Sequence, residues 1–115
     1  MPQDSLSIED RVGTQPGQRI LKLTGTLVLT TVFQFQTTVR SDQSQTLIID
    51  FSEVPYVDSA GIGSLVGAYV SRQHSGRNLA LVGVNQRIHN TLQITHVEQF
   101  FRFFDSVAAA ESPAS

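Results

Sequence analysis

The chain has 115 residues, of which 40% are hydrophobic and 16% are charged, and its formal net charge is −2 at pH 7. This size and composition are typical of one globular domain with a single core, and they exclude a disordered chain. The eight basic residues are scattered, so the chain lacks the clustered positive charge of a nucleic-acid-binding protein. It has no cysteine, which excludes disulfides and cysteine-ligated zinc.

The beginning of the chain lacks the basic and apolar segments of a signal peptide, and no apolar run approaches the ~20 residues of a membrane span. We therefore expect a cytoplasmic protein that does not insert into membranes and does not bind nucleic acid directly. We expect one domain over residues 1–115, with its core at residues 5–111 and a frayed tail at residues 112–115.

The first two predicted elements are strands. Leu6–Glu9 alternates apolar and polar residues, as an edge strand does, and Ile20–Leu23 is typical of a second strand. Gly13, Pro16 and Gly17 mark a turn between them. The sequence therefore predicts a hairpin at one edge of a sheet.

Residues 27–40 give conflicting signals. Leu29, Val32 and Phe33 have helical spacing, whereas the many threonine and valine residues favour a strand. The next strand, Thr46–Phe51, is a continuous apolar run typical of a buried parallel strand. Because a parallel neighbour must be reached by a crossover connection, we predict a helix for residues 27–40.

A second helix is predicted to begin at Ser59 and to end at Ser75 and Gly76, where a glycine favours a helix C-terminus. Asp58 and Ser59 both belong to residue types that cap helix N-termini. One face of this helix, which we expect to pack on the core, has five apolar residues at helical spacing: Ile62, Leu65, Val66, Tyr69 and Val70.

The remaining elements are short. Asn78–Val82 is a further buried strand, which completes a β-α-β unit. We then predict a short helix capped by Asn85, a strand at Phe100–Phe104 with about half of its rings in the core, and a helix over Val107–Ala110 capped by Ser106. The order of elements indicates an α/β fold.

Ser59 is the candidate functional residue of this chain. A hydroxyl at a helix N-terminus lies where the macrodipole and the free amide groups favour negative charge, so the position suits a phosphate. The alternative is that Ser59 is an ordinary N-cap, since serine is common there.

Metal and nucleotide chemistry have weaker support. Asp50, Glu53 and Asp58 lie near the end of one strand, but a magnesium site needs phosphate or further oxygen ligands. Gly61–Gly67 has the wrong spacing for a dinucleotide fingerprint, and its glycines instead allow a close approach by the sheet or a partner. Irregular spacing argues against a metal site formed by the histidines, which we expect to be surface or loop residues: His74, His89 and His96.

Leu47–Ser52 followed by Val57–Gly63 resembles the signature of the STAS domain, in which a hydrophobic strand and a short loop precede Asp-Ser-Ser/Thr/Ala-Gly and a helix. Nearly the whole chain is covered, with supporting matches at Ile20–Gly25, Leu79–Val84 and Phe104–Ser106. The chain is similar to the stand-alone anti-sigma factor antagonists of bacteria. This resemblance implies a mixed, mostly parallel sheet of about four or five strands with an edge hairpin, and about four helices packed mainly on one face.

The resemblance also implies a function. Ser59 would be phosphorylated by a partner that is both an anti-sigma factor and a serine kinase of the GHKL type. The unmodified protein would bind that partner and free a sigma factor, phosphorylation would end the binding, and a PP2C-type phosphatase would restore it. No cofactor, metal or catalytic residue is implied, and the partner-binding residues would be Asp58, Ser59, Ala60, Gly61, Gly63 and Ser64.

One position departs from the family pattern. Family members commonly have an acidic residue in a Gly-x-x-Asp pattern after the second strand, whereas this chain has Val28 three residues after Gly25. The departure favours a second hypothesis, a non-switching STAS interaction module such as a stressosome-like component or a subunit of a lipid-transport complex. A third, a small nucleotide-binding or hydrolytic enzyme, lacks a base, a metal set and a phosphate-binding lysine. An exposed edge strand or a phenylalanine patch could support a weak homodimer.

Overall fold

A computed structural model describes residues 5–112 of the chain. The elements are, in order, β1 (Leu6–Val12), β2 (Gln18–Gly25), α1 (Val32–Ser41), β3 (Thr46–Glu53), α2 (Ser59–His74), β4 (Asn78–Val82), α3 (Gln86–Ile94), the 3-10 turn η1 (Glu98–Phe100), β5 (Arg102–Phe104) and α4 (Val107–Glu111). Within this described part, no helix is long and apolar enough to cross a membrane. The predicted frayed tail, apart from Ser112, lies outside the described residues.

The strands form one five-stranded sheet in the order β1-β2-β3-β4-β5. β1 pairs antiparallel with β2, and the other neighbouring strands are parallel. Leu21, Ile49 and Leu81 lie side by side across the three central strands, which places a row of apolar side chains on one face. The predicted edge hairpin and the mostly parallel sheet are therefore confirmed.

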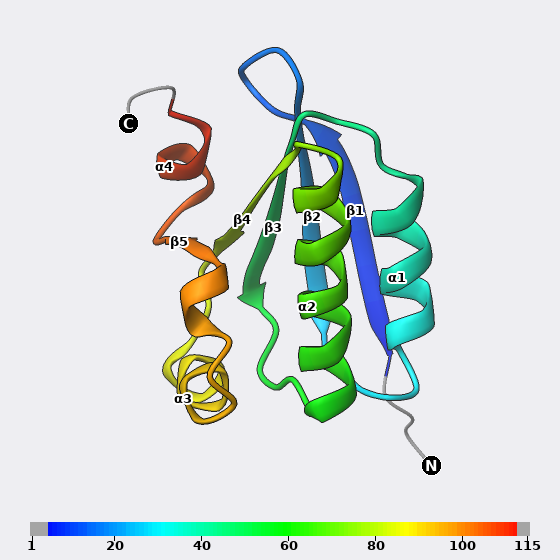
Figure 1. The fold of residues 1–115 in the computed structure, drawn as a ribbon, viewed down its shortest axis with the longest axis vertical. Helices are drawn as coiled ribbons and strands as arrows, with labels where there is room; N and C mark the ends of the chain where they lie inside the picture. The colour runs from blue at the N-terminus through cyan, green and yellow to red at the C-terminus, as the bar shows by residue number, and fades with distance from the viewer. Residues whose placement is uncertain (1–4, 113–115) are drawn as a thin grey trace.

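The helices cover the two faces of the sheet unequally. α1 and α2 lie side by side against one face (Figure 1), and α3 adds Ile88 and Leu92 to the same core. α4 packs on the opposite face, where Val107 and Ala110 contact a smaller cluster around Ile48. The prediction of about four helices packed mainly on one face is confirmed for the described residues.

The helix predicted for residues 27–40 begins only at Val32. Residues 27–31 form a loop instead, in which Leu27 and Val28 are buried at 0% and 7% exposure. The buried Thr31 hydroxyl accepts a hydrogen bond from the Val28 N–H at 2.9 Å and donates one to the Thr26 carbonyl at 2.9 Å. These local bonds replace the helical pattern that the spacing predicted.

Two other predictions need correction. Val70 is 56% exposed, because it lies nine residues after the buried Gly61 and so points to the opposite side of α2, at about 100° per residue. β5 contains only Arg102–Phe104, since Glu98–Phe100 forms a 3-10 turn. Phe100 is consequently half-exposed and stacks on Tyr69, with 5.3 Å between the ring centroids.

The far end of α2 is held by a buried arginine. Arg72 is 3% exposed, and its guanidinium donates from Nη1 to the Asp42 carboxylate at 3.0 Å, from Nη2 to the Ser44 carbonyl at 2.5 Å and from Nε to the Asn78 carbonyl at 2.9 Å. Burial lowers the pKa of Arg72, and the neighbouring Asp42 carboxylate opposes that shift. Arg72 therefore ties α2 to β4 and to the connection between α1 and β3.

Candidate functional site

Asp58 holds the beginning of α2 with both of its carboxylate oxygens. Oδ1 accepts a hydrogen bond from the Gly61 N–H at 2.8 Å, which makes Asp58 the N-cap of the helix. Oδ2 accepts a bond from the Leu29 N–H at 3.1 Å, in the loop between β2 and α1. The carboxylate therefore joins two segments that are 29 residues apart in sequence.

The loop between β2 and α1 also contacts the loop before α2 through the backbone. Leu27 and Val57 form an isolated parallel bridge. The Leu27 N–H donates to the Tyr56 carbonyl, and the Asp58 N–H donates to the Leu27 carbonyl, both at 3.2 Å. A Cβ atom added to Gly61 would lie 2.2 Å from the Leu27 carbonyl oxygen, so this close approach requires glycine.

The loop before α2 is also fixed from the side of α3. The Asn85 amide nitrogen donates to the Val54 and Pro55 carbonyl oxygens at 3.3 Å each, while its Oδ1 caps α3 through the Ile88 N–H at 2.8 Å. Segments on both sides thus restrain the chain that leads to Ser59.

Ser59 is exposed and is the first residue of α2. The cap is Asp58, so the alternative interpretation of Ser59 as an ordinary N-cap is wrong. Asp58 takes the cap because its extended backbone and its side chain direct a carboxylate to the Gly61 N–H. The Ser59 hydroxyl therefore lies on the surface, at the positive end of the helix dipole.

The other predicted partner-binding residues divide by burial. Gly63 is exposed and Ala60 is half-buried, so both lie on the outer side of α2 with Ser59. Gly61 and Ser64 are buried, and the Ser64 hydroxyl donates to the Gly61 carbonyl at 2.7 Å. The sequence segment thus supplies an outer surface and an inner set of residues that support it.

The carboxylates and histidines do not come together. Asp50 is 8% exposed, and its Oδ1 accepts a hydrogen bond from the Ser52 N–H at 2.9 Å. His74 and His96 are exposed, whereas His89 is half-buried on α3, 3.5 Å from the Glu98 carboxylate. Among residues 5–112, no group of three histidine or acidic residues could hold a metal ion.

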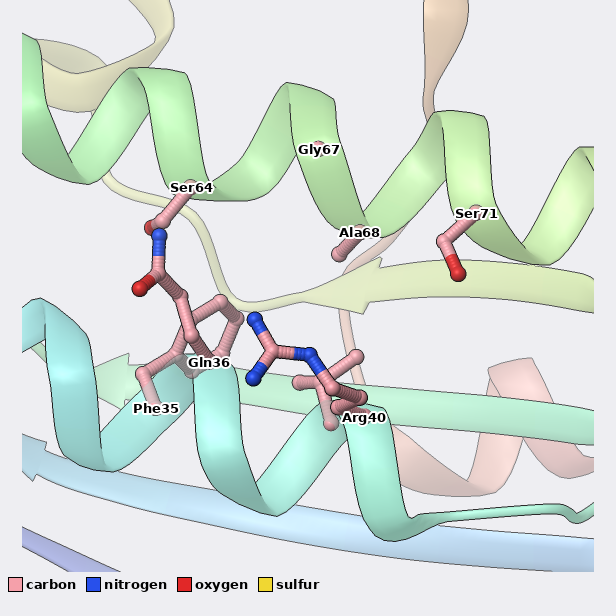
Figure 2. A pocket seen from close by; sticks show the side chains of 8 residues that line it. Phe35, Gln36, Arg40, Ser64, Gly67, Ala68 and Ser71 are labelled. Atoms are coloured by element: carbon pink, nitrogen blue, oxygen red, sulfur yellow. The ribbon is translucent and has the colours of Figure 1, made fainter.

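Sequence reasoning missed a groove between α1 and α2. Figure 2 shows Gln36 and Arg40 extending from α1 toward the side of α2 that bears Ser64 and Gly67. The groove encloses about 160 Å³, and the buried Phe35 lies at its base. The signal in the sequence was the spacing of small residues on α2 at intervals of three and four, which allows another segment to approach closely. The sequence did not show that this segment is α1.

The fold and the site define an α/β domain with an exposed serine at the start of the helix that follows its central strand. The STAS domain model matches residues 11–110, and the chain therefore belongs to the STAS domain family.

Curated relatives share part of the sequence. The anti-sigma-B factor antagonist of Listeria monocytogenes is 41% identical over 49 residues, which are 43% of this chain and 43% of that protein. The chain thus spans less than half the length of the first curated relatives it matches. The anti-sigma-B factor antagonist of Staphylococcus aureus is 30% identical over 78 residues, which are 65% of this chain and 72% of that protein.

Solved structures share the fold over most of the chain. An anti-sigma factor antagonist from Mycobacterium paratuberculosis has a TM-score of 0.77 at 16% identity, over 93% of this chain and 94% of that chain. The Bacillus cell fate determinant SpoIIAA in its phosphorylated form has a TM-score of 0.70 at 15% identity, over 90% of this chain and 96% of that chain.

Proposed function

We propose that this chain is an anti-sigma factor antagonist switched by phosphorylation at Ser59. In its unmodified form it binds an anti-sigma factor that is also a GHKL-type serine kinase, and a sigma factor is released. Phosphorylation of Ser59 ends the binding, and a PP2C-type phosphatase restores it. The chain then works as a binding protein of the cytoplasm, with one STAS domain whose core spans residues 5–111.

The observation that supports this proposal most strongly is the exposed Ser59 hydroxyl beside an aspartate that is already occupied. Both carboxylate oxygens of Asp58 accept hydrogen bonds from backbone amides. Ser59 is exposed, so its hydroxyl is accessible to an enzyme. The names of the relatives point to the same role, and SpoIIAA, which shares the fold, has been solved in a phosphorylated form.

The physical effect of phosphate differs between the free protein and the complex. A phosphoserine adds about −1.5 to −2 charge, which the N-terminus of α2 tolerates because the helix dipole favours an anion there. In an interface the same phosphate must lose its hydration, and the uncompensated charge costs several kcal/mol. Phosphorylation therefore changes affinity without unfolding the domain.

The proposed partner-binding set has six residues, in which the buried members support the exposed ones: Asp58, Ser59, Ala60, Gly61, Gly63 and Ser64.

The test is the intact mass of the protein purified from its own host, before and after phosphatase treatment. We expect a phosphatase-sensitive gain of one phosphate that maps to Ser59. Ser59→Ala should abolish it, whereas Ser71→Ala, an exposed serine on the same helix, should keep it. A phosphate that persists in Ser59→Ala would place the modification elsewhere.

A non-switching STAS interaction module is the second candidate. The observation that favours it is Val28, which is 7% exposed and leaves no acidic side chain at this position of the loop that contacts Asp58. If Ser59 is never modified while a partner stays bound, this second function replaces the first.

A further inference from the structure

The strand β1 has a free edge that is suited to pairing with another strand. β1 is the first strand in the sheet order, so within the described residues it pairs only with β2. Its seven residues keep one register with β2 throughout, and every residue of β1 after Ile8 is exposed. The strand contains no proline and no bulge, which are two of the devices that block a free edge. Its backbone is therefore open to a further strand.

The hydrogen-bonding groups on this edge belong to the even-numbered residues. Just beyond β1, the Gly13 N–H donates to the Gln18 carbonyl of β2 at 3.0 Å. Hydrogen-bonded and non-hydrogen-bonded pairs alternate along an antiparallel ladder, so the odd-numbered residues of β1 bond to β2. The N–H and C=O groups of Ile8, Asp10 and Val12 therefore point away from β2, toward the free edge.

Symmetry restricts how a second copy of β1 can join this edge. Two identical strands pair antiparallel about a twofold axis that is perpendicular to the sheet. This axis keeps the same face of both sheets on the same side, so each residue lies opposite one that points to the same face. Because side chains alternate between faces along a strand, the numbers of two opposite residues must have an even sum.

One of the allowed registers matches both charge and hydrophobicity. With Asp10 on the axis, Glu9 of each copy lies opposite Arg11 of the other copy, on the face that bears α4. On the other face, Ile8 of each copy lies opposite Val12 of the other copy. Val12 is 67% exposed in the single chain, and this contact would cover it. Opposite charges and apolar side chains that face each other across two strands stabilise their pairing.

The neighbouring registers place unsuitable side chains together. With Glu9 on the axis, the two Glu9 carboxylates face each other and Ile8 lies opposite Asp10. With Arg11 on the axis, two arginines face each other. The two Asp10 carboxylates also meet in the favoured register, but each is already paired with Arg19 of its own chain, at 2.5 Å between Oδ1 and Nε. The charge on the axis is therefore balanced within each copy.

We propose that this protein forms a twofold-symmetric dimer, in which the β1 strands of two copies pair antiparallel with Asp10 on the axis. The two sheets then form one continuous sheet, joined by two ion pairs and two apolar contacts. The outer edges of this sheet are the two β5 strands, which have only three residues each, so assembly stops at two copies. β1 contains none of residues 58–64, so dimerisation and the proposed function can be tested separately.

The test is the molar mass of the protein in solution as a function of concentration, measured by sedimentation. The variants are Glu9→Arg and Arg11→Glu, each of which turns both ion pairs between the copies into pairs of like charge. The double variant exchanges the two charges and restores both pairs. An equimolar mixture of the two single variants also restores them, because one chain then presents two cations and the other presents two carboxylates.

Matched controls make the same charge changes outside β1. They are Glu53→Arg and Arg40→Glu, both at exposed positions. We expect the wild type to dimerise reversibly, each single variant in β1 to weaken dimerisation at least about tenfold, and the controls to stay within about twofold. The double variant and the mixture should dimerise again. Thermal unfolding checks that every variant is folded.

Three results would overturn the inference. The first is a wild type that stays monomeric up to about 1 mM. The second is a dimer that the single variants in β1 leave intact, since another face would then hold the copies together. The third is a mixture of folded single variants that fails to recover the dimer, because the proposed register requires recovery.

Hydrogen exchange of the wild-type amides tests the register without any variant. The amides of Ile8, Asp10 and Val12 should exchange more slowly in concentrated than in dilute protein, because they bond to β1 of the second copy only in the dimer. The amides of Glu9 and Arg11 bond to β2 and should be protected at both concentrations. Exchange at the three outward amides that does not depend on concentration would also overturn the inference.

Discussion

At the scale of single residues, Asp58 and Gly61 determine how the surface around Ser59 is built. Asp58 needs two acceptor oxygens because it receives N–H groups from Leu29 and Gly61. Position 61 requires glycine because a side chain there would collide with the Leu27 carbonyl. The requirements are different, so different substitutions test them.

Asp58→Asn should keep the helix cap and lose the contact with Leu29. An asparagine has one acceptor oxygen, so its NH₂ group would face the Leu29 N–H as a second donor. We expect the free energy of unfolding to fall by about 1 kcal/mol in Asp58→Asn and by about 2 kcal/mol in Asp58→Ala, which also loses the cap. Urea unfolding measures both. An unchanged Asp58→Asn would argue that the bond to Leu29 contributes nothing, and equal losses in the two variants would argue that the cap contributes nothing.

Gly61→Ala and Gly63→Ala form a matched pair on the first turns of α2. The new methyl group at position 61 would lie 2.2 Å from the Leu27 carbonyl oxygen and 2.5 Å from Cγ1 of Val57, so the backbone must shift. We expect Gly61→Ala to lower the free energy of unfolding by about 2–3 kcal/mol. Gly63→Ala meets no described atom within 4 Å and should raise it by about 0.5–1 kcal/mol, because alanine favours a helix. Chemical denaturation of both proteins checks the opposite signs.

At the scale of elements, α2 is fixed at both ends by contacts with segments distant in sequence. Its beginning is joined to the loop before α1 through Asp58, and its last turn is joined to β4 and to the loop before β3 through Arg72. The helix itself has small residues on its outer side, so these end contacts, with the core contacts of Ile62 and Leu65, determine where it lies.

Arg72→Met should therefore destabilise the domain strongly. The methionine would fill the space but leave the Asp42 carboxylate, whose side chain is 11% exposed, without its cation, and two carbonyl oxygens without their donor. We expect a loss of about 3 kcal/mol in the free energy of unfolding, whereas Arg11→Met on the exposed surface should change it by less than about 0.5 kcal/mol. Arg72→Lys should not restore stability, because a single ammonium group cannot reach three acceptors that the guanidinium contacts through three nitrogens. Thermal and urea unfolding test the series, and a stable Arg72→Met would contradict it.

At the scale of the whole molecule, the sheet and its unequal covering keep Ser59 apart from the core. The main core lies between the sheet and α1, α2 and α3, while the first turn of α2 extends past the end of β3 (Figure 1). A negative charge at position 59 therefore meets solvent and the helix dipole, and it disturbs no buried contact.

Ser59→Asp tests this separation. The carboxylate at the first position of α2 should leave the free energy of unfolding within about 1 kcal/mol of the wild type, since acidic residues are favoured in a first turn. The same variant should weaken binding to the partner by about 100-fold or more. Thermal unfolding and a binding titration, made on the same protein, separate the two effects. A large loss of stability would mean that charge at this position acts through the fold.

Much of the fold could be predicted from local signals. The strand β4 has the predicted bounds, and β3 continues only two residues beyond them, because a continuous apolar run is a strong signal for a buried strand. Asn85 and Ser106 cap α3 and α4 as predicted, since capping depends on a side chain and an N–H group three residues away. The start of α2 at Ser59 follows from the same local chemistry.

What the sequence determined by itself was the order of the elements, the α/β class and the position of Ser59 at a helix start, because periodicity and capping act within a few residues. Only the tertiary structure decided that residues 27–31 form a loop that contacts the start of α2, that Arg72 rather than Val70 is buried, and that Leu29 and Phe33 are exposed. Each of these depends on which segments the strand order brings together. Contacts across 28 to 30 residues, such as those of Asp58 and Arg72, have no local pattern that a sequence could display.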